Sequence, residues 1–250
     1  MKVQLSCKNG RVIENVNLSK DVFRIEVEGD FNIKPGQFFM LRCYDEEPIL
    51  SRPISVHDNE DGVVSFLYQR KGRGTSIMTK LKKYDDIKLT GPLGNGFDIE
   101  KIKGKIAIVT GGIGIAPMLY TVKKLRECDI DLYAGFKDEI YSVDEFAQYV
   151  SNIYISTESG QYGYKGYVTD IFSPFEYNVV LCCGPEVMME KIVKVCKTYA
   201  TPVYVSMERH MACGIGACLG CTCETKHGNK RVCKDGPIFY GRDVFIGAKC

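Results

Sequence analysis

The stretch Ile106-Ala-Ile-Val-Thr-Gly-Gly-Ile-Gly-Ile-Ala-Pro117 decides the fold of the central part of this chain. Its first residues, Ile106 to Thr110, form a continuous apolar run, as expected of a strand in a parallel sheet covered on both faces. A glycine-rich turn follows, and the apolar spacing then predicts a helix from about Ala116 to Glu127. A buried strand, a glycine turn and a helix in this order predict an α/β domain of the nucleotide-binding kind.

The alternation of strand and helix continues over residues 99–206. Further strands of the same sheet are expected at Ile130–Tyr133, Ile153–Ser156 and Val179–Cys182. A second helix is expected to begin at Pro185, because proline suits the first turn of a helix. Its apolar side is predicted to consist of Met188, Ile192 and Val195. We therefore predict a Rossmann-like domain with a parallel sheet at residues 99–206.

Residues 1–98 show a second pattern, that of an antiparallel sheet. Short runs rich in Val, Ile and Phe alternate with turn signals such as Pro35-Gly36 and Asp61-Gly62. The runs expected to form strands are Val22–Val27, Gln37–Arg42, Val63–Tyr68 and Ile87–Thr90. Several short strands at this spacing favour a closed β-barrel.

A block of cysteines near the C-terminus forms the third pattern. Its spacing is C-x4-C-x2-C with a more distant fourth cysteine, given by Cys213, Cys218, Cys221 and Cys233. This spacing is typical of plant-type [2Fe–2S] clusters, whereas zinc ribbons have paired C-x2-C motifs. Intervening glycines allow backbone N–H groups to turn toward sulfur. A structural zinc site and disulfides are the alternatives. Cys223 is a competing ligand, but Cys221 restores the two-residue interval.

From about Met207 the sequence is rich in Gly and Cys and has little periodicity. We expect residues 207–250 to be held by a metal cluster and not by an apolar core. The other cysteines are expected to be reduced and mostly buried, because the chain is neither short nor evidently secreted. They are Cys7, Cys43, Cys128, Cys182 and Cys196, and the final Cys250 is expected to be incidental.

The composition excludes several classes of protein. With 250 residues, 45% hydrophobic residues and a net charge of +2, the chain is expected to be a soluble globular protein. Lys and Arg are interleaved with Asp and Glu, which argues against nucleic-acid binding. No apolar run approaches the roughly 18–20 residues that span a bilayer, and the first residues lack the apolar stretch of a signal peptide. We expect a cytoplasmic protein with no membrane partner.

Two segments of the barrel region suit a phosphate group. Arg52-Pro-Ile-Ser55, expected between two strands, offers a guanidinium that can bind phosphate oxygens in pairs. Lys71-Gly-Arg-Gly-Thr-Ser76 leads into a short helix expected at Ile77–Leu81, which Thr75 or Ser76 is expected to cap. The free N–H groups at the start of that helix would face a phosphate. An exposed arginine beside a proline and an ordinary glycine turn are the plainer alternatives.

The glycine turn after Thr110 lies where a nucleotide-binding turn belongs. It departs from the G-x-G-x-x-G fingerprint, because Pro117 occupies the third glycine position. Cys183-Gly-Pro185 repeats the arrangement after a later strand. Ligands of such sheets bind at the carboxyl ends of the strands, where both turns are expected. A generic strand–helix turn is the alternative.

Together these motifs resemble those of the ferredoxin–NADP reductase superfamily over essentially the whole chain. The terminal block Met211-Ala-Cys-Gly-Ile-Gly-Ala-Cys-Leu-Gly-Cys221, with Val232-Cys-Lys-Asp-Gly-Pro237, is similar in particular to the electron-transfer subunits of NAD-linked dihydroorotate dehydrogenases. The resemblance implies FAD bound by Arg52, Pro53, Ile54, Ser55, Gly72, Gly74, Thr75 and Ser76. It implies NAD bound by Gly111, Gly112, Gly114, Pro117, Cys183 and Gly184, with Thr157 and Glu158 on the ribose side. Many superfamily members have tyrosine where Ile54 stands, so that stacking contact is absent here.

The resemblance further implies an electron relay. A partner subunit would oxidise dihydroorotate with its own FMN, and single electrons would pass through a [2Fe–2S] cluster to FAD and then as hydride to NAD+, in pyrimidine biosynthesis. A heterotetramer with two copies of each subunit is expected. His57, His210 and His227 are isolated in the sequence and expected to be incidental, so the substrate chemistry would lie on the partner.

Two other functions are also compatible with the sequence. One is a subunit of another iron–sulfur flavoprotein reductase, linked to ferredoxin or sulfide. Related subunits of that kind tend to have an aspartate in place of one cysteine ligand, whereas this sequence has four cysteines. The other is a non-enzymatic module stabilised by zinc. Met211, Ile215 and Leu219 flank the cysteines and would either face a partner or exclude water from the cluster.

Overall fold

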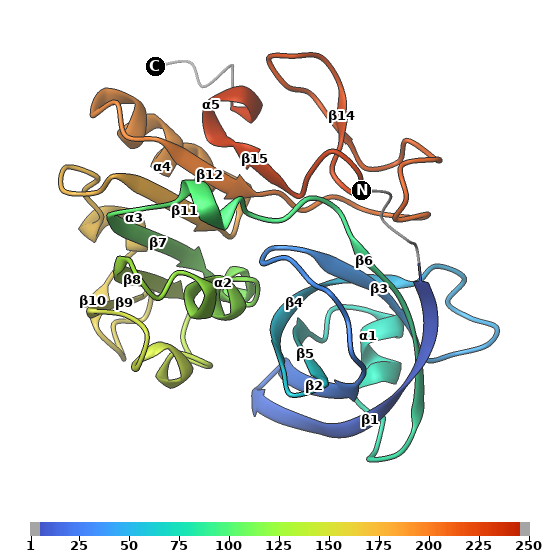
Figure 1. The fold of residues 1–250 in the computed structure, drawn as a ribbon. Coiled ribbons are helices and arrows are strands. Elements are labelled where there is room, and N and C mark those ends of the chain that lie inside the picture. The colour runs from blue at the N-terminus through green and yellow to red at the C-terminus, as the bar shows by residue number, and fades with distance from the viewer. Residues whose placement is uncertain (1–5, 246–250) are drawn as a thin grey trace.

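The computed structural model describes residues 6–245, which form a β-barrel, an α/β layer and a C-terminal segment (Figure 1). In Figure 1 the barrel is blue to cyan at the lower right, the α/β layer is green to orange at the left, and the C-terminal segment is drawn above both. The expected fold class is therefore confirmed. Within residues 6–245, no helix is long and apolar enough to cross a membrane.

Six antiparallel strands close the barrel in the order β1-β2-β5-β4-β3-β6. They are β1 Ser6–Ser19, β2 Val22–Glu28, β3 Phe38–Arg42, β4 Arg52–Glu60, β5 Val63–Gln69 and β6 Asp86–Leu93, with the short helix α1 Arg73–Met78 between the last two. The four expected strands are confirmed as β2, β3, β5 and β6. The expectation that Arg52–Ser55 lies between strands is wrong, because these residues begin β4. Pro53 is tolerated there because it stands near the start of the strand.

The barrel interior is filled by side chains that point inward from all of its strands. Phe39 of β3 packs edge-on against Phe31 and Phe66, an arrangement that aromatic rings prefer. Other side chains that are almost completely buried in this core are Val12, Ile25, Leu41, Val56 and Leu89. The barrel therefore has an apolar core of its own.

The second sheet has seven strands in the order β10-β9-β8-β7-β11-β12-β15. They are β7 Lys105–Gly111, β8 Asp129–Phe136, β9 Asn152–Thr157, β10 Tyr164–Lys165, β11 Val179–Cys183, β12 Val203–Ser206 and β15 Ile238–Tyr240. All neighbours are parallel except β15, which runs antiparallel to β12. The chain starts in the middle, at β7, and builds outward in both directions. The change of direction falls between β7 and β11, which is where such sheets bind ligands.

The helices of the α/β layer differ in detail from the predicted ones. They are the 3₁₀ turns η1 Ile99–Lys101, η2 Gly112–Ile115 and η3 Asp144–Phe146, and the α-helices α2 Met118–Lys124, α3 Val168–Ile171 and α4 Glu186–Thr198. The helix predicted from Ala116 is shorter, because a 3₁₀ turn and Pro117 precede α2. On α4 the predicted burial of Ile192 is confirmed, but Met188 and Val195 are only half-buried, and Met189, Val193 and Cys196 are buried in their place.

The C-terminal segment is built into the core, contrary to expectation. It contains a small hairpin of β13 Thr222–Cys223 and β14 Lys230–Arg231, then β15 and the short helix α5 Gly241–Val244. Cys221 and Val232 belong to one apolar cluster with Met40 of the barrel and Val205 of the sheet. Packing therefore holds this segment, in addition to any metal cluster.

Candidate functional site

Arg52 and Gly74 bring the two phosphate-binding candidates of the barrel together. A Cβ atom at position 74 would come within 3.0 Å of Arg52 Cζ and Nη2, and closer still to its Nε. Only glycine therefore lets the Arg52 guanidinium lie against the first turn of α1. Arg52, Ser55 and Thr75 line the same cavity. The two sequence motifs thus form one site.

The expected cap of the short helix is wrong. Helix α1 begins at Arg73, not near Ile77, and its N-cap residue is Gly72. The Thr75 hydroxyl lies inside the first turn and accepts hydrogen bonds from the backbone N–H groups of Lys71 at 3.0 Å and Gly72 at 3.1 Å. Thr75 therefore fixes the loop before the helix, while Ser76 forms part of the helix itself.

A cavity of about 240 Å³ lies where the barrel, the sheet and the C-terminal segment meet. Strand β4 contributes Arg52, Pro53, Ile54 and Ser55 to its wall. The nucleotide turn contributes Ile113, Ala116 and Pro117, and the segment leading to the cysteines contributes Met207, Arg209 and Met211. Tyr68 and the half-buried Ile54 both line it. Each of the three regions predicted from sequence therefore reaches this one cavity.

The two glycine turns touch each other at the switch point of the sheet. A Cβ at Gly114 would lie 2.5 Å from the carbonyl carbon of Cys183, and one at Gly184 would lie 2.9 Å from the amide nitrogen of Gly111. Gly184 also has a positive φ of +156°. These glycines are needed because the backbones of the turns after β7 and β11 approach too closely for side chains.

A second cavity, of about 480 Å³, opens beside these turns. Gly111, Gly112 and Glu158 line it, as do Ser156, Tyr167 and Lys191, which the sequence analysis missed. The Ser156 hydroxyl is buried and has no hydrogen-bond partner among the described residues. A buried hydroxyl of this kind is satisfied when a polar ligand fills the cavity, so the lining fits a nucleotide.

Thr157 does not line this cavity. It is completely buried, and its hydroxyl binds the backbone of Tyr162 at 2.8 Å. Its predicted place beside a ribose is therefore wrong, because its hydroxyl is already used within the protein. The thiol of Cys183 is also buried and lines neither cavity, and burial raises its pKa. Gly184 and the backbone of Cys183 bring this turn close to Gly111 and Gly114.

Three of the four predicted cluster cysteines accept backbone hydrogen bonds at sulfur. Gly216 N–H donates to Cys233 Sγ at 3.1 Å, Cys218 N–H to Cys213 Sγ at 3.4 Å, and Cys233 N–H to Cys221 Sγ at 3.4 Å. Burial acts to raise the pKa of the Cys213 thiol, but backbone N–H groups led by that of Cys218 outweigh it and lower the pKa to about 6. The fourth thiol, Cys218, is exposed. This donor set fits thiolate ligands of an iron–sulfur cluster.

The contacts of these cysteines bear on two of the alternatives, disulfides and a role for Cys223. All described cysteines are free, which argues against the disulfide alternative. Cys223 lies on β13, where burial raises its pKa, and it makes no hydrogen bond to the other thiols in the described part. These contacts favour Cys221 over Cys223.

The remaining cysteines and histidines only partly follow expectation. Cys182 and Cys196 are buried, but Cys43 and Cys128 are half-buried and Cys7 is exposed, while Cys250 lies outside the described residues. His210 is exposed, and His227 pairs with Asp243 at 3.6 Å on the surface. The expectation that His57 is incidental is wrong, because it is completely buried between the barrel and the α/β layer.

Comparison with known proteins agrees with this geometry. The family model of the iron-sulfur cluster binding domain of dihydroorotate dehydrogenase B matches residues 208–245. The dihydroorotate dehydrogenase B (NAD(+)) electron transfer subunit of Clostridium acetobutylicum is 54% identical over 236 residues, which cover 94% of this chain and 96% of that protein. The corresponding subunit of Clostridium perfringens is 50% identical over 239 residues, with coverage of 94% and 96%.

Solved structures show the same architecture. The structure of an NADH-dependent reduced ferredoxin–NADP oxidoreductase, described for flavin-based electron bifurcation, superimposes with a TM-score of 0.85 and 28% identity over 94% of this chain and 89% of that one. A ferredoxin–NADP+ reductase from Neisseria gonorrhoeae with bound FAD and NADP has a TM-score of 0.64 and 15% identity over 82% and 95% of the two chains, and shows the fold alone. Because relatives at 54% and 50% identity span nearly its whole length, the chain belongs to the family of dihydroorotate dehydrogenase B (NAD(+)) electron transfer subunits.

Proposed function

We propose that this chain carries electrons from a partner subunit that oxidises dihydroorotate, through a [2Fe–2S] cluster and FAD, to NAD+ in pyrimidine biosynthesis. The observation that carries the proposal is the 240 Å³ cavity, whose wall joins the Arg52–Ser55 strand, the nucleotide turn at Pro117 and the cysteine segment at Met211. A flavin bound there would adjoin both the nicotinamide site and the cluster. When bound, these groups supply one-electron transfer, conversion of single electrons to pairs, and hydride transfer.

In this proposal the chain itself binds and orients the flavin. The Arg52 guanidinium and the backbone N–H groups around Gly72 and Gly74 would hold its phosphates. Thr75 would act indirectly, because its hydroxyl fixes the loop at Lys71 and Gly72. Pro53, Ile54, Ser55 and Ser76 complete the FAD contacts that we propose.

The nucleotide would bind at the carboxyl ends of β7 and β11. Gly111 and Gly112 line the 480 Å³ cavity and would leave room for a pyrophosphate close to the backbone. Gly114 and Gly184 let the two turns lie against each other, with Pro117 and the backbone of Cys183 beside the nicotinamide. Ser156 offers a hydroxyl in the same cavity that has no hydrogen-bond partner within residues 6–245. The Glu158 carboxylate also lines it, and a negative charge there suits the free ribose hydroxyls of NAD and repels the 2′-phosphate of NADP.

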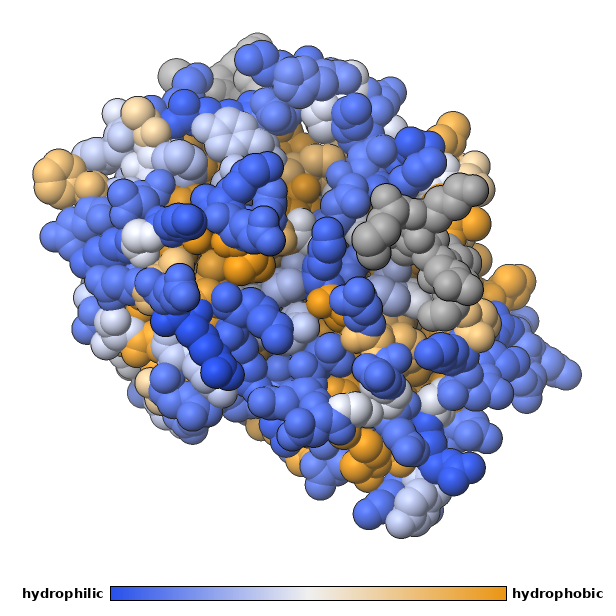
Figure 2. All heavy atoms as spheres, viewed as in Figure 1, coloured by the Kyte–Doolittle hydropathy of each residue, from blue (hydrophilic) through white to orange (hydrophobic). Residues whose placement is uncertain are grey.

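The ligands of the cluster would be Cys213, Cys218, Cys221 and Cys233. The exposure of the neighbouring apolar residues supports a partner surface there and not only exclusion of water. Leu219 is 61% exposed and Ile215 is 45% exposed. Figure 2 shows a mostly hydrophilic face on which hydrophobic residues form small groups and not one continuous patch. We propose that the FMN subunit covers Ile215 and Leu219, in a cytoplasmic heterotetramer with two copies of each subunit.

Co-purification with the partner tests this function. The complex should contain flavin and [2Fe–2S] absorption bands and should reduce NAD+ with dihydroorotate. Cys218→Ser should remove the cluster bands and the NAD-linked turnover, whereas Cys223→Ser, a matched change two residues beyond Cys221, should leave both. A cluster-free Cys218→Ser complex with full NAD-linked turnover would exclude the relay. A colourless protein that binds zinc would instead support the non-enzymatic alternative.

A further inference from the structure

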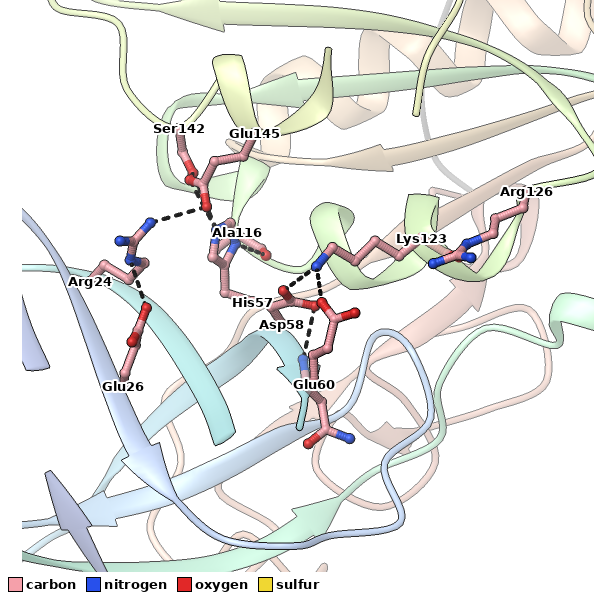
Figure 3. A network of polar contacts seen from close by, with 11 residues as sticks. Arg24, Glu26, His57, Asp58, Glu60, Ala116, Lys123, Arg126, Ser142 and Glu145 are labelled. Atoms are coloured by element: carbon pink, nitrogen blue, oxygen red, sulfur yellow. Dashed lines mark hydrogen bonds and ion pairs between the residues drawn. The ribbon is translucent and has the colours of Figure 1, made fainter. Parts of the chain in front are cut away.

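His57 joins the flavin strand to the nucleotide turn. It lies on β4 two residues after Ser55, and its side chain is completely buried against the α/β layer (Figure 3). Its Nδ1 lies 2.8 Å from the carbonyl oxygen of Ala116. A carbonyl oxygen only accepts, so Nδ1 carries the proton and donates. Ala116 precedes Pro117, and both line the cavity that Arg52–Ser55 also line.

The other ring nitrogen holds a second loop of the α/β layer. His57 Nε2 lies 3.2 Å from Ser142 Oγ and 3.5 Å from Glu145 Oε1. Glu145 is held in turn by Arg24 of β2 at 3.1 Å, and Arg24 also pairs with Glu26 at 3.3 Å. Figure 3 shows Ser142, Glu145 and Ala116 around the imidazole, with Arg24 reaching Glu145. The ring is therefore fixed in one orientation by contacts on both of its nitrogens.

A separate ion pair attaches the far end of α2 to the same strand. Lys123 Nζ lies 2.5 Å from Asp58 Oδ2 and 2.7 Å from Glu60 Oε2, as Figure 3 also shows. Lys123 lines neither the 240 Å³ cavity proposed for FAD nor the 480 Å³ cavity proposed for NAD. The nucleotide turn thus has one attachment to β4 beside the cavity, from Ala116 to His57, and α2 has one remote from it, at Lys123.

We propose that His57 is a positioning residue for hydride transfer, because its bond to Ala116 sets the distance between the nucleotide turn and the flavin strand. The inference rests on the proposed function. The proposed function runs from reduced flavin to NAD+; in the reverse half-reaction, NADH would give up a hydride with its two electrons to oxidised FAD and become NAD+, with the reacting atoms at the same separation. Transfer of this kind depends steeply on the separation of the reacting atoms, since a displacement of about 1 Å is enough to cost about 100-fold in rate.

Two amide side chains, substituted for His57, distinguish the two contacts of the imidazole. The side-chain nitrogen of Asn is attached at the same distance along the chain as Nδ1, so His57→Asn keeps a donor for Ala116. The side-chain nitrogen of Gln corresponds to Nε2, so His57→Gln keeps only the contact with Ser142 and Glu145. Ser142→Ala removes an Nε2 contact and leaves His57 in place. Lys123→Met removes the remote attachment and serves as the control for docking stability.

The experiment follows reduction of the FAD-loaded protein by NADH in an anaerobic stopped-flow instrument. At saturating NADH we expect His57→Gln to lower the rate of flavin reduction about 10-fold or more and to weaken the long-wavelength charge-transfer absorption of stacked nicotinamide and flavin. His57→Asn, Ser142→Ala and Lys123→Met should keep the wild-type rate within about 2-fold and keep the band, even where the unfolding temperature falls. FAD content should be unchanged in all of them.

A wild-type rate and band in His57→Gln would overturn the inference. So would losses in His57→Asn, Ser142→Ala or Lys123→Met that follow the fall in unfolding temperature, because His57 would then act through stability alone. If His57→Gln does not fold, the other three variants still decide between these outcomes. A wild-type protein whose FAD is not reduced by NADH would overturn the proposed function instead.

Discussion

Replacing Gly114 by alanine should force the two nucleotide turns apart. The new Cβ would lie 2.5 Å from the carbonyl carbon of Cys183, about 0.9 Å inside the 3.4 Å at which ordinary contact begins. The obstacle is backbone and cannot rotate away as a flexible side chain does, so the turn after β7 must move away from β11. Overpacking of this kind costs about 1–3 kcal/mol, which in a chain of this length lowers the unfolding temperature by about 2–12 °C.

Thermal unfolding and NADH titration measure the two consequences. Because the displaced turn is the proposed pyrophosphate site, the NADH concentration for half-maximal flavin reduction should rise about 10-fold or more. Gly62→Ala is the control: its Cβ meets nothing within 4 Å but sits at a φ of +75°, so it should lose about 1–2 kcal/mol without changing the NADH dependence. If Gly114→Ala unfolds and saturates like the wild type, the close approach of the turns is refuted.

Three further outcomes follow from the structure. Burial acts to raise the pKa of Glu145, but the hydrogen bond and charge of His57 outweigh it and lower the pKa from 4.5 to about 2. The ionised Glu145 should therefore stabilise the fold fully above pH 4.5, and this stabilisation should be lost as the pH falls toward 2. Acid unfolding monitored by circular dichroism should accordingly be less steep in Glu145→Gln. Cys233→Ser should abolish the cluster absorption, and retention of a normal spectrum would argue for a different ligand set. Leu219→Asp should weaken binding of the FMN subunit in sedimentation experiments while flavin content stays constant; unchanged binding would place the partner elsewhere.

Local patterns predicted most of the fold. The continuous apolar runs at β7 and β11 and the alternating runs of the barrel were identifiable because burial on two faces or one face leaves a distinct periodicity. Strand β4 was not predicted, because Pro53 interrupts the strand pattern near its beginning. Strand β15 escaped because it has only three residues and pairs with β12, which lies more than thirty positions earlier in the chain.

The site was predictable only where its residues act through their backbone or their spacing. Glycine turns and cysteine spacings consist of residues that are close together in the sequence, so Gly111, Gly114 and the C-x4-C-x2-C block could be recognised from the sequence alone. Ser156 and His57 could not, because their roles depend on the residues that surround them in the folded protein. The partner of His57, the carbonyl oxygen of Ala116, is 59 residues away, and no local pattern contains that contact. The missing hydroxyl partner of Ser156 is likewise a property of the folded cavity.

Different interactions fix the two sides of the 240 Å³ cavity, the side of the cysteine segment and the side of the nucleotide turn. On the cluster side, the C-terminal segment packs into an apolar core shared with Met40 and Val205, and a Cβ at Gly214 would lie 2.7 Å from Met40 Cγ. On the nucleotide side, Ala116 is attached to β4 by the hydrogen bond of His57, and α2 is attached to it by the ion pairs of Lys123. Close packing resists displacement, and the His57 contact is completely buried, whereas the pair of Lys123 with the largely exposed Glu60 weakens with salt. Because the attachment beside the cavity, at His57, is buried and the pair that salt weakens, at Lys123, is remote from the cavity, high salt should lower the unfolding temperature without slowing reduction of the flavin by NADH.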